Sequence, residues 1–131
     1  MKLNKYKLLF WIWLSTILTV SSIPGISTPS ISVERFHLEL RLDYILHFLE
    51  YMILVFLFYK WKNEYKFFKI FISIGVFVII AGIDEFHQLI IPGRVFNPND
   101  LFFNILGLIA GTVFTTLFLR AKNNIPSADL Q

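Results

Sequence analysis

The chain has 131 residues, of which 56% are hydrophobic and 15 are phenylalanine, and its mean hydropathy is +0.64. A soluble domain of this length cannot bury so much apolar surface, so the composition indicates an integral membrane protein with one domain. The net charge of +3 lies in short clusters beside apolar runs, a pattern that orients a membrane protein and argues against nucleic acid as a partner. The absence of cysteine excludes disulfides, thiolate metal sites and a cysteine nucleophile in this chain.

Lys2, Lys5 and Lys7 precede an apolar run from Leu8 to Ile23, which ends before Pro24-Gly25 and indicates a span at about residues 6–23. A cleaved signal peptide has a similar basic start and short apolar core, but the small-x-small cleavage pattern is missing here. We therefore predict a first transmembrane helix. The next segment, residues 26–41, carries balanced charge and is expected to be a loop with an interfacial stretch near residues 33–40.

Three further spans are predicted at about residues 42–59, 67–91 and 101–119. Each is close to the roughly 20 residues that a helix needs to cross a bilayer. The expected fold class is therefore all-α, a polytopic membrane protein whose four transmembrane helices form a bundle. The membrane domain is expected to cover residues 1–122, followed by a disordered cytoplasmic tail at residues 123–131.

Positive charge predicts how these spans are oriented. Lysines gather at the N-terminus and in the 60–69 loop, and basic residues follow the last span, whereas the other two loops carry little positive charge. Because cytoplasmic loops are enriched in lysine and arginine, both termini are expected in the cytoplasm. The start of the second span, the end of the third and the start of the fourth then lie at one level, in the outer half of the membrane.

Polar and ionisable residues gather at that level, where they are costly unless they meet partners or water. The residues concerned are Asp43, His47, Glu50, Tyr51, Asp84, Glu85, His87, Gln88, Arg94, Asp100 and Asn104. Because residues three or four apart share one face of a helix, we expect Asp84, His87 and Gln88 to face one pocket. If the third span stays helical to Ile91, Asp84 lies about 10 Å below its outer end.

Two features of the fourth span allow a packing role as well. Gly107 and Gly111 form a small-residue pattern that lets helices approach closely. The same pattern could also join two copies of the chain in a homo-oligomer. Asp100 follows Asn97-Pro98-Asn99, so it could favour the first turn of a helix instead of serving a pocket. We expect the glycines to pack and Asn104 to reach the pocket, and we leave both roles open for Asp100.

The spacing of these residues resembles the VanZ-like family of small bacterial membrane proteins. The matching motifs are Asp43-x-x-x-His47-x-x-x-Tyr51, Asp84-Glu85-x-His87-Gln88-x-x-x-Pro92-Gly93-Arg94 and Asp100-x-x-x-Asn104-x-x-Gly107-x-x-x-Gly111. Tyr44 departs from the pattern, since many relatives carry lysine there, and this argues against a role for a cation at that position. The resemblance implies a multi-pass protein of the bacterial cytoplasmic (inner) membrane, and the family is named for a member associated with resistance to the glycopeptide teicoplanin.

The residue types limit the chemistry. No serine or cysteine falls in the outer parts of spans two to four, so a serine-type triad lacks its nucleophile. The candidate general acids and bases are His47, Glu50, Asp84, Glu85 and His87. The candidate substrate-binding residues are Asp43, Tyr51, Gln88, Arg94, Asp100 and Asn104. Arg94 is placed to clamp a phosphate, or to serve as an interfacial anchor or a partner of Asp84 or Asp100.

The cofactor stays open at this point. Mixed imidazole and carboxylate ligands suit a divalent cation, but the spacing matches no dedicated metal motif. A hydrogen-bonded ionic network of the kind that intramembrane charges form is the alternative.

Two function classes follow. The first is an enzyme, a hydrolase or transferase acting on a phosphate-bearing lipid head group such as that of a phospholipid or a polyprenyl-phosphate carrier. The resemblance favours it, because VanZ-like proteins look distantly similar to phospholipid head-group-exchange enzymes. The alternative is a non-catalytic membrane protein that binds lipid or antibiotic, or a small oligomeric transporter. A transporter predicts a water path through the inner half of the membrane, where spans two and three are strongly apolar apart from Ser73.

Overall fold

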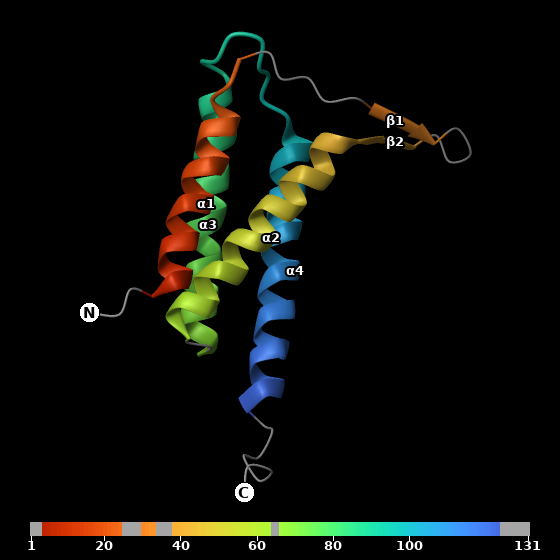
Figure 1. Cartoon of the computed structure of the whole chain (residues 1–131). Helices are drawn as coiled ribbons and strands as arrows, with labels where there is room; N and C mark the ends of the chain where they lie inside the picture. Colours follow the sequence, from red (N-terminus) through yellow and green to blue (C-terminus); the bar gives the residue numbers. More distant parts are fainter. Residues whose placement is uncertain (1–3, 25–29, 34–37, 64–65, 124–131) are drawn as a thin grey trace, which may run out of the picture.

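The computed structural model describes residues 4–24, 30–33, 38–63 and 66–123. These residues form four helices, α1 (Lys5–Ser21), α2 (Leu42–Lys62), α3 (Phe67–Gln88) and α4 (Pro98–Asn123), and two strands, β1 (Ser30–Val33) and β2 (Leu38–Arg41). The helices make one bundle in which α2 packs most extensively against α4, and α1 packs against α2 and α3 (Figure 1). The start of α1 and the end of α4 lie at the same, lower end of the bundle.

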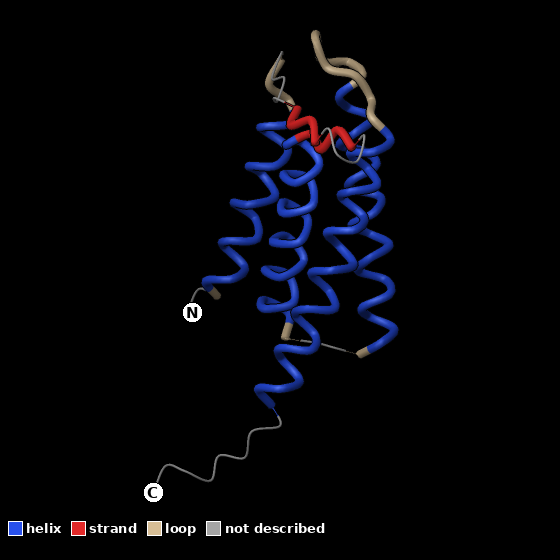
Figure 2. The backbone as a smooth tube through the Cα atoms, turned by 90° about the vertical axis from the view of Figure 1, so that its right-hand side faces the viewer, coloured by secondary structure: helices blue, strands red, loops and turns tan. Residues whose placement is uncertain are grey.

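The bundle is all-helical, as predicted, and a small hairpin lies outside it. β1 and β2 pair antiparallel with Ser30 opposite Arg41, at the upper end of the bundle (Figure 2). We had expected a loop there. Of the predicted tail at residues 123–131, Asn123 is the last residue of α4, and residues 124–131 lie outside the described residues.

The end of α3 differs from the prediction and moves the site closer to the membrane surface. The helix ends at Gln88 instead of Ile91, and three-residue turns follow, in which Ile91 N–H donates to the Gln88 carbonyl. Proline explains this end, because Pro92 disfavours helical backbone at the residue before it. Asp84 therefore lies four residues, about 6 Å, from the end of the helix.

Three helices are long and apolar enough to cross a membrane, and together with the family they make this a membrane protein. They are Leu42–Lys62, Phe67–Gln88 and, within α4, Pro98–Ala121. The remaining helix, α1, has 17 residues and is about 25 Å long, somewhat less than the roughly 30 Å of a hydrocarbon core.

The distribution of polar groups is the reverse of that in a soluble domain. α3 exposes Phe67 at 83% and also Phe71 and Ile79, while it buries Asp84 and Glu85 near its upper end. Exposed apolar surface of this extent requires an apolar surrounding, and buried ionisable groups require partners inside the bundle. The lipid-facing surface and the polar interior are therefore set by the same helices.

Two glycines bring α2 and α4 together. A Cβ atom on Gly107 would overlap the backbone oxygen of Phe48, and one on Gly111 would lie 2.7 Å from the backbone oxygen of Met52. Small residues permit this close approach, as the sequence pattern predicted. Because α2 of the same chain occupies these glycine faces, a homo-oligomer would have to use another surface.

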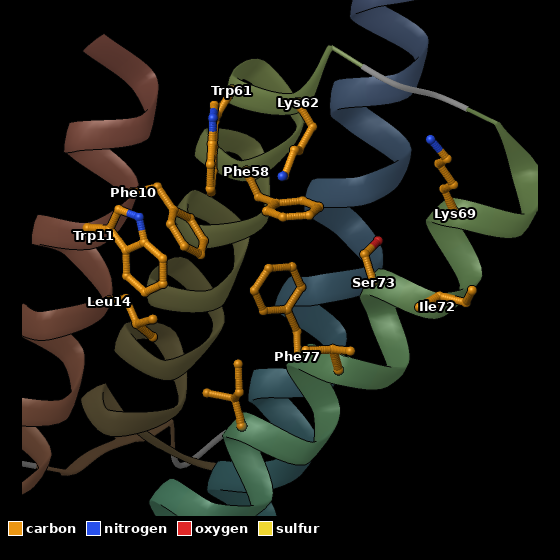
Figure 3. Close-up of a pocket in the computed structure, with 12 residues that line it drawn as sticks. Phe10, Trp11, Leu14, Phe58, Trp61, Lys62, Lys69, Ile72, Ser73 and Phe77 are labelled. Atoms are coloured by element: carbon orange, nitrogen blue, oxygen red, sulfur yellow. The ribbon is translucent and has the colours of Figure 1, made fainter. Parts of the chain in front are cut away.

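The lower half of the bundle holds an aromatic cluster. Phe10 packs against Phe58 and Phe77, with ring centroids 5.8 and 6.1 Å away. A cavity of about 470 Å³ lies between these rings, with Lys62 and Lys69 at its edge (Figure 3). Among the described residues, the lining is apolar except for these lysines and Ser73, so it contributes no carboxylate or histidine to this cavity.

Candidate functional site

The upper end of the bundle holds a polar cavity of about 420 Å³. It is lined by residues from the end of β2, the start of α2, the loop after α3 and the start of α4: Arg41, Asp43, Tyr44, His47, Gln88, Gly93, Arg94, Val95, Phe96, Asn97, Asn99 and Asp100. A smaller cavity of about 60 Å³ shares several of these residues and adds Ser21, Glu50 and Asp84. The candidate residues of spans two, three and four thus meet at one place.

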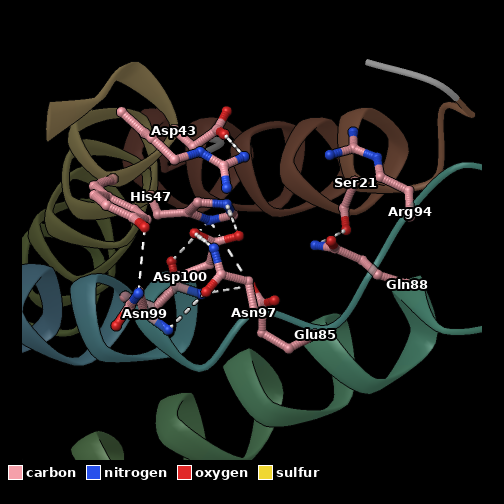
Figure 4. A network of polar contacts seen from close by, with 12 residues as sticks. Ser21, Asp43, His47, Glu85, Gln88, Arg94, Asn97, Asn99 and Asp100 are labelled. Atoms are coloured by element: carbon pink, nitrogen blue, oxygen red, sulfur yellow. Dashed lines mark hydrogen bonds and ion pairs between the residues drawn. The ribbon is translucent and has the colours of Figure 1, made fainter. Parts of the chain in front are cut away.

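Asn104 lies at the centre of the polar network. Its amide nitrogen donates to Glu85 Oε1 over 3.2 Å, and its amide oxygen lies 3.1 Å from His47 Nδ1 (Figure 4). Asn104 and Glu85 are both 0% exposed. A single side chain of α4 therefore orients one residue of α2 and one of α3.

Three carboxylates surround the imidazole of His47. Asp100 Oδ2 lies 3.7 Å from Nε2, while Glu50 Oε2 and Glu85 Oε1 lie 3.8 and 3.9 Å from Nδ1. These separations are too long for direct hydrogen bonds but short enough for strong electrostatic interaction. The centre of the site is thus a histidine enclosed by acids from three helices.

Asp100 serves the helix start and the site at once. The Asn97 side chain accepts from the N–H of Asn99 over 3.0 Å, as an N-cap does, and donates to Asp100 Oδ1 over 2.9 Å. The other carboxylate oxygen, Oδ2, is the one that faces His47. Both roles left open for Asp100 are therefore present, one on each oxygen.

Arg41 and Asp43 form an ion pair at the rim of the cavity. Arg41 Nη2 donates to Asp43 Oδ2 over 2.6 Å, and this hydrogen bond raises the pKa of the guanidinium further. The guanidinium also lies 5.8 Å from the ring of Tyr44, whose hydroxyl accepts from Asn99. Arg41 was not among the predicted site residues, yet it supplies a permanent cation next to Tyr44.

Arg94 is tied to the end of α1. Its Nε donates to the Ile23 carbonyl over 3.2 Å and its Nη2 to the Val20 carbonyl over 3.1 Å. These contacts use two of the five N–H donors of a guanidinium, so donors are left for a ligand. Arg94 lines both cavities, so its hydrogen bonds connect the C-terminal end of α1 to the wall of the site.

We expect Arg94→Gln to loosen the end of α1, because two carbonyls lose a charged donor. Hydrogen–deuterium exchange at residues 20–23 should become several-fold faster, corresponding to about 0.5–1.5 kcal/mol for partly exposed hydrogen bonds. Arg120→Gln is the matched control, since Arg120 is exposed near the other end of the bundle. Equal exchange at residues 20–23 in both variants would contradict this role.

A comparison with known families matches most of the chain. The model of the VanZ/LLP1 family matches residues 4–119, which include nearly all of the described bundle. The chain belongs to the VanZ/LLP1 family. Membership supports a membrane location and suggests a link to glycopeptide resistance. No curated protein and no solved structure matches this chain.

One predicted residue of this VanZ/LLP1 chain does not reach the site. His87 is exposed and lines neither polar cavity, whereas Asp84, Glu85 and Gln88 are buried. Successive helical residues are about 100° apart, so residues 84, 85 and 88 fall within about 100° and His87 falls outside that arc. The expectation that Asp84, His87 and Gln88 share the pocket face was therefore wrong for His87.

Tyr51 and Asp84 lie below the main cavity. Tyr51 is fully buried in the core, and its hydroxyl has no hydrogen-bond partner among the described residues. Asp84 lines the smaller cavity, and its Oδ1 is likewise buried without a hydrogen bond in the described part of the chain. These polar atoms extend the site toward the middle of the bundle.

Ser21 is a site residue that the sequence analysis missed. It lies in the last turn of α1, lines the smaller cavity and accepts from Gln88 Nε2 over 3.2 Å. The search for a nucleophile had considered spans two to four alone. Its position in the sequence could have indicated this role, because Ser21 lies just before Pro24 at the end of the first span, which is on the same side as the predicted site. Its hydrogen-bond partners are the Gln88 amide and the Asp84 carboxylate and not a histidine, so a serine-type triad is not formed by these contacts.

Proposed function

We propose that this protein acts on a phosphate-bearing lipid head group that enters the upper polar cavity. The observation that carries the proposal is that Arg41, Arg94 and His47 line one cavity. Planar guanidinium groups bind phosphate oxygens through paired hydrogen bonds, and an imidazole beside carboxylates can move a proton. Phosphate binding and proton transfer are thus available within one space of about 420 Å³.

The rim of the cavity supports a lipid as the ligand. Ile90 is 78% exposed and Val95 is 77% exposed, and both lie in the loop between α3 and α4 that contributes to the cavity wall. Apolar residues exposed at this level suit the boundary between head groups and acyl chains. A lipid could therefore keep its chains beside the bundle while its head group reaches Arg94.

In this proposal α1 is a fourth span, and both termini lie in the cytoplasm of a bacterial cell, with the protein in its cytoplasmic membrane. Trp13 Nε1 donates to the Glu50 backbone oxygen over 2.9 Å, which joins α1 to a spanning helix. The lysines at residues 5, 7, 60, 62, 66 and 69 belong to the lower end, where α1 starts and α2 meets α3. Their excess on that side supports a position of the polar cavity in the outer leaflet.

The reaction class that fits these groups is hydrolysis or head-group transfer. Arg41 and Arg94 would hold the phosphate. His47 would accept the proton of an attacking water or alcohol as the new P–O bond forms, and would return it to the leaving oxygen as the old P–O bond breaks. Asp100 and Glu85 would stabilise the imidazolium that results. Asn104 would hold His47 and Glu85 in place, as its two hydrogen bonds do here.

A purely binding function is the alternative, with lipid or a glycopeptide antibiotic as the ligand. The family link to glycopeptide resistance is the reason to consider an antibiotic as the ligand. Transport fits less well, because the cavity at the lower end is lined by aromatic rings instead of polar groups. Teicoplanin susceptibility of cells with and without the protein would show whether the resistance link extends to this chain.

Comparison of lipids in matched cells tests the proposal. Wild type, Glu85→Gln, His47→Gln and His87→Gln would be expressed at equal levels in a bacterial membrane, and phospholipids and cell-wall precursors compared by mass spectrometry. We expect a head-group species that changes with wild type and His87→Gln, and a loss of that change of at least about 100-fold in the other two variants. Identical profiles for wild type and Glu85→Gln, with both inserted, would favour the binding alternative.

A further inference from the structure

Three side chains in the network have the spacing of a metal centre. One ligand atom each from His47, Glu85 and Asp100 lies within 4.8 Å of the other two. The three residues come from α2, α3 and α4, so the bundle itself assembles the set. Glu85 and Asp100 are buried, which distinguishes them from a solvated acidic patch.

The burial of Glu85 is an independent sign of a missing partner. Its carboxylate is fully buried, and Oε2 has no hydrogen-bond partner among the described residues. Its other oxygen accepts from the neutral amide of Asn104. A buried carboxylate is costly unless it is paired with a cation or coordinates a metal, so Glu85 points to a positive ligand in the site.

The orientation of Asn104 indicates which atom of His47 is available. Because the Asn104 amide nitrogen donates to Glu85, its oxygen faces His47 Nδ1, which must carry the hydrogen of that bond. The neutral imidazole then has its lone pair on Nε2, and this atom faces Asp100 Oδ2 at 3.7 Å. Two acceptors that face each other at this distance can be joined by a metal ion between them.

We propose that His47 Nε2, Glu85 and Asp100 bind one divalent transition-metal ion such as Mn²⁺ or Zn²⁺. A nitrogen with two carboxylate oxygens suits these ions better than Ca²⁺, which takes about six to eight oxygen ligands. Asn104 orients two of the ligands and so acts as a positioning residue. Three protein ligands leave open coordination positions, and His47 and Asp100 line the cavity that also contains Arg41 and Arg94.

The use of this metal on a phosphate rests on the proposed function, whereas metal binding itself does not. In that use an open position would take a phosphate oxygen or a water molecule. His47 would then be a ligand and not the proton acceptor, and the carboxylate of Glu50, which lines the smaller cavity, would accept the proton instead. The binding test below measures the ion directly, so the two proposals can fail separately.

The test uses the purified full chain in detergent, stripped of metal with chelator and titrated with Mn²⁺. Electron paramagnetic resonance distinguishes bound from free Mn²⁺, and we expect a single Mn²⁺ per chain that Zn²⁺ displaces. Glu85→Gln and Asp100→Asn should each weaken binding by at least about 100-fold, and Asn104→Ala by about 10–100-fold. His87→Gln is the matched control, because His87 is exposed and lines neither polar cavity; it should bind as wild type does.

A measurement on wild type alone guards against variants that fail to fold. Pulsed electron paramagnetic resonance of the Mn²⁺ complex should show coupling to an imidazole nitrogen, since His47 is a ligand. The inference is overturned if wild type binds no Mn²⁺ at millimolar concentration, if the nitrogen coupling is missing, or if Glu85→Gln and Asp100→Asn bind as wild type does. In those cases a protonated His47 is the positive partner of the two acids.

The lipid comparison and the metal titration separate the two proposals. If Mn²⁺ binds but no lipid changes, the metal site is supported and the head-group function is contradicted for the lipids tested. If the lipid change occurs although the protein binds no metal, the head-group function is supported and the metal site is contradicted.

Discussion

Asn104→Leu is expected to lower the free energy of unfolding by about 2–5 kcal/mol, because the buried Glu85 and the Nδ1 of His47 both lose their partner. Leucine has the same side-chain branching and number of heavy atoms as asparagine, so no cavity is left; the effect comes from the lost hydrogen bonds and from fitting the larger methyl groups at a fully buried position. Unfolding by SDS from mixed micelles, followed by circular dichroism, measures the change. An effect below about 1 kcal/mol would contradict the central role of Asn104.

A double-mutant cycle separates the pair from its surroundings. Glu85→Leu alone leaves the Asn104 amide nitrogen without its acceptor. The Asn104→Leu/Glu85→Leu double variant removes both partners of the 3.2 Å hydrogen bond. We expect the double variant to be less destabilised than the sum of the single variants by about 1–3 kcal/mol. Additive effects within about 0.5 kcal/mol would show that the two residues are not coupled.

Gly107→Ala is expected to lower the free energy of unfolding by about 1–3 kcal/mol, because the added methyl group would overlap the backbone oxygen of Phe48. Backbone cannot move aside as a flexible side chain can, so α2 and α4 must separate. The same SDS unfolding experiment measures the change. A small shift of α4 would also displace Asn104 and Asp100, so Mn²⁺ binding should weaken in the same variant.

Gly82→Ala provides the matched control in α3. No atom lies within 4 Å of a Cβ placed on Gly82, and alanine is the better helix former by up to about 1 kcal/mol. Its free energy of unfolding should be unchanged or slightly higher. If Gly107→Ala and Gly82→Ala behave alike, the close approach of α2 to α4 is not what holds the site together.

The elements that could be predicted from the sequence are those set by local properties. The apolar runs placed α2, α3 and α4 correctly to within a few residues, because crossing a bilayer demands length and hydrophobicity from each segment by itself. The glycine pattern also indicated close packing of α4. The end of α3 was predicted at Ile91, but the helix ends at Gln88. Tight turns occupy the residues between Gln88 and Pro92, so the helix stops before the residue that precedes the proline.

The errors in the site came from interactions between elements. Ser21 and Arg94 meet because the end of α1 lies beside the loop after α3, and no spacing within one segment reveals that contact. The exclusion of His87 depended on the rotation of α3 about its own axis. This rotation is set by which neighbours the helix packs against, and the three-residue spacing alone allowed the wrong face.

The sequence by itself determined that this is a membrane protein of the VanZ/LLP1 family and that its candidate site residues lie near one level of the bundle. Hydropathy and helical rise are sufficient for those conclusions, because both act along a single segment. The tertiary structure alone decided which atoms face one another. One ligand atom each of His47, Glu85 and Asp100 is brought within 4.8 Å of the others by three helices. Glycine contacts set the close approach of α2 to α4, and Asn104 contacts both His47 and Glu85. Distances of that size between distant segments arise from packing, and no pattern within one segment contains them.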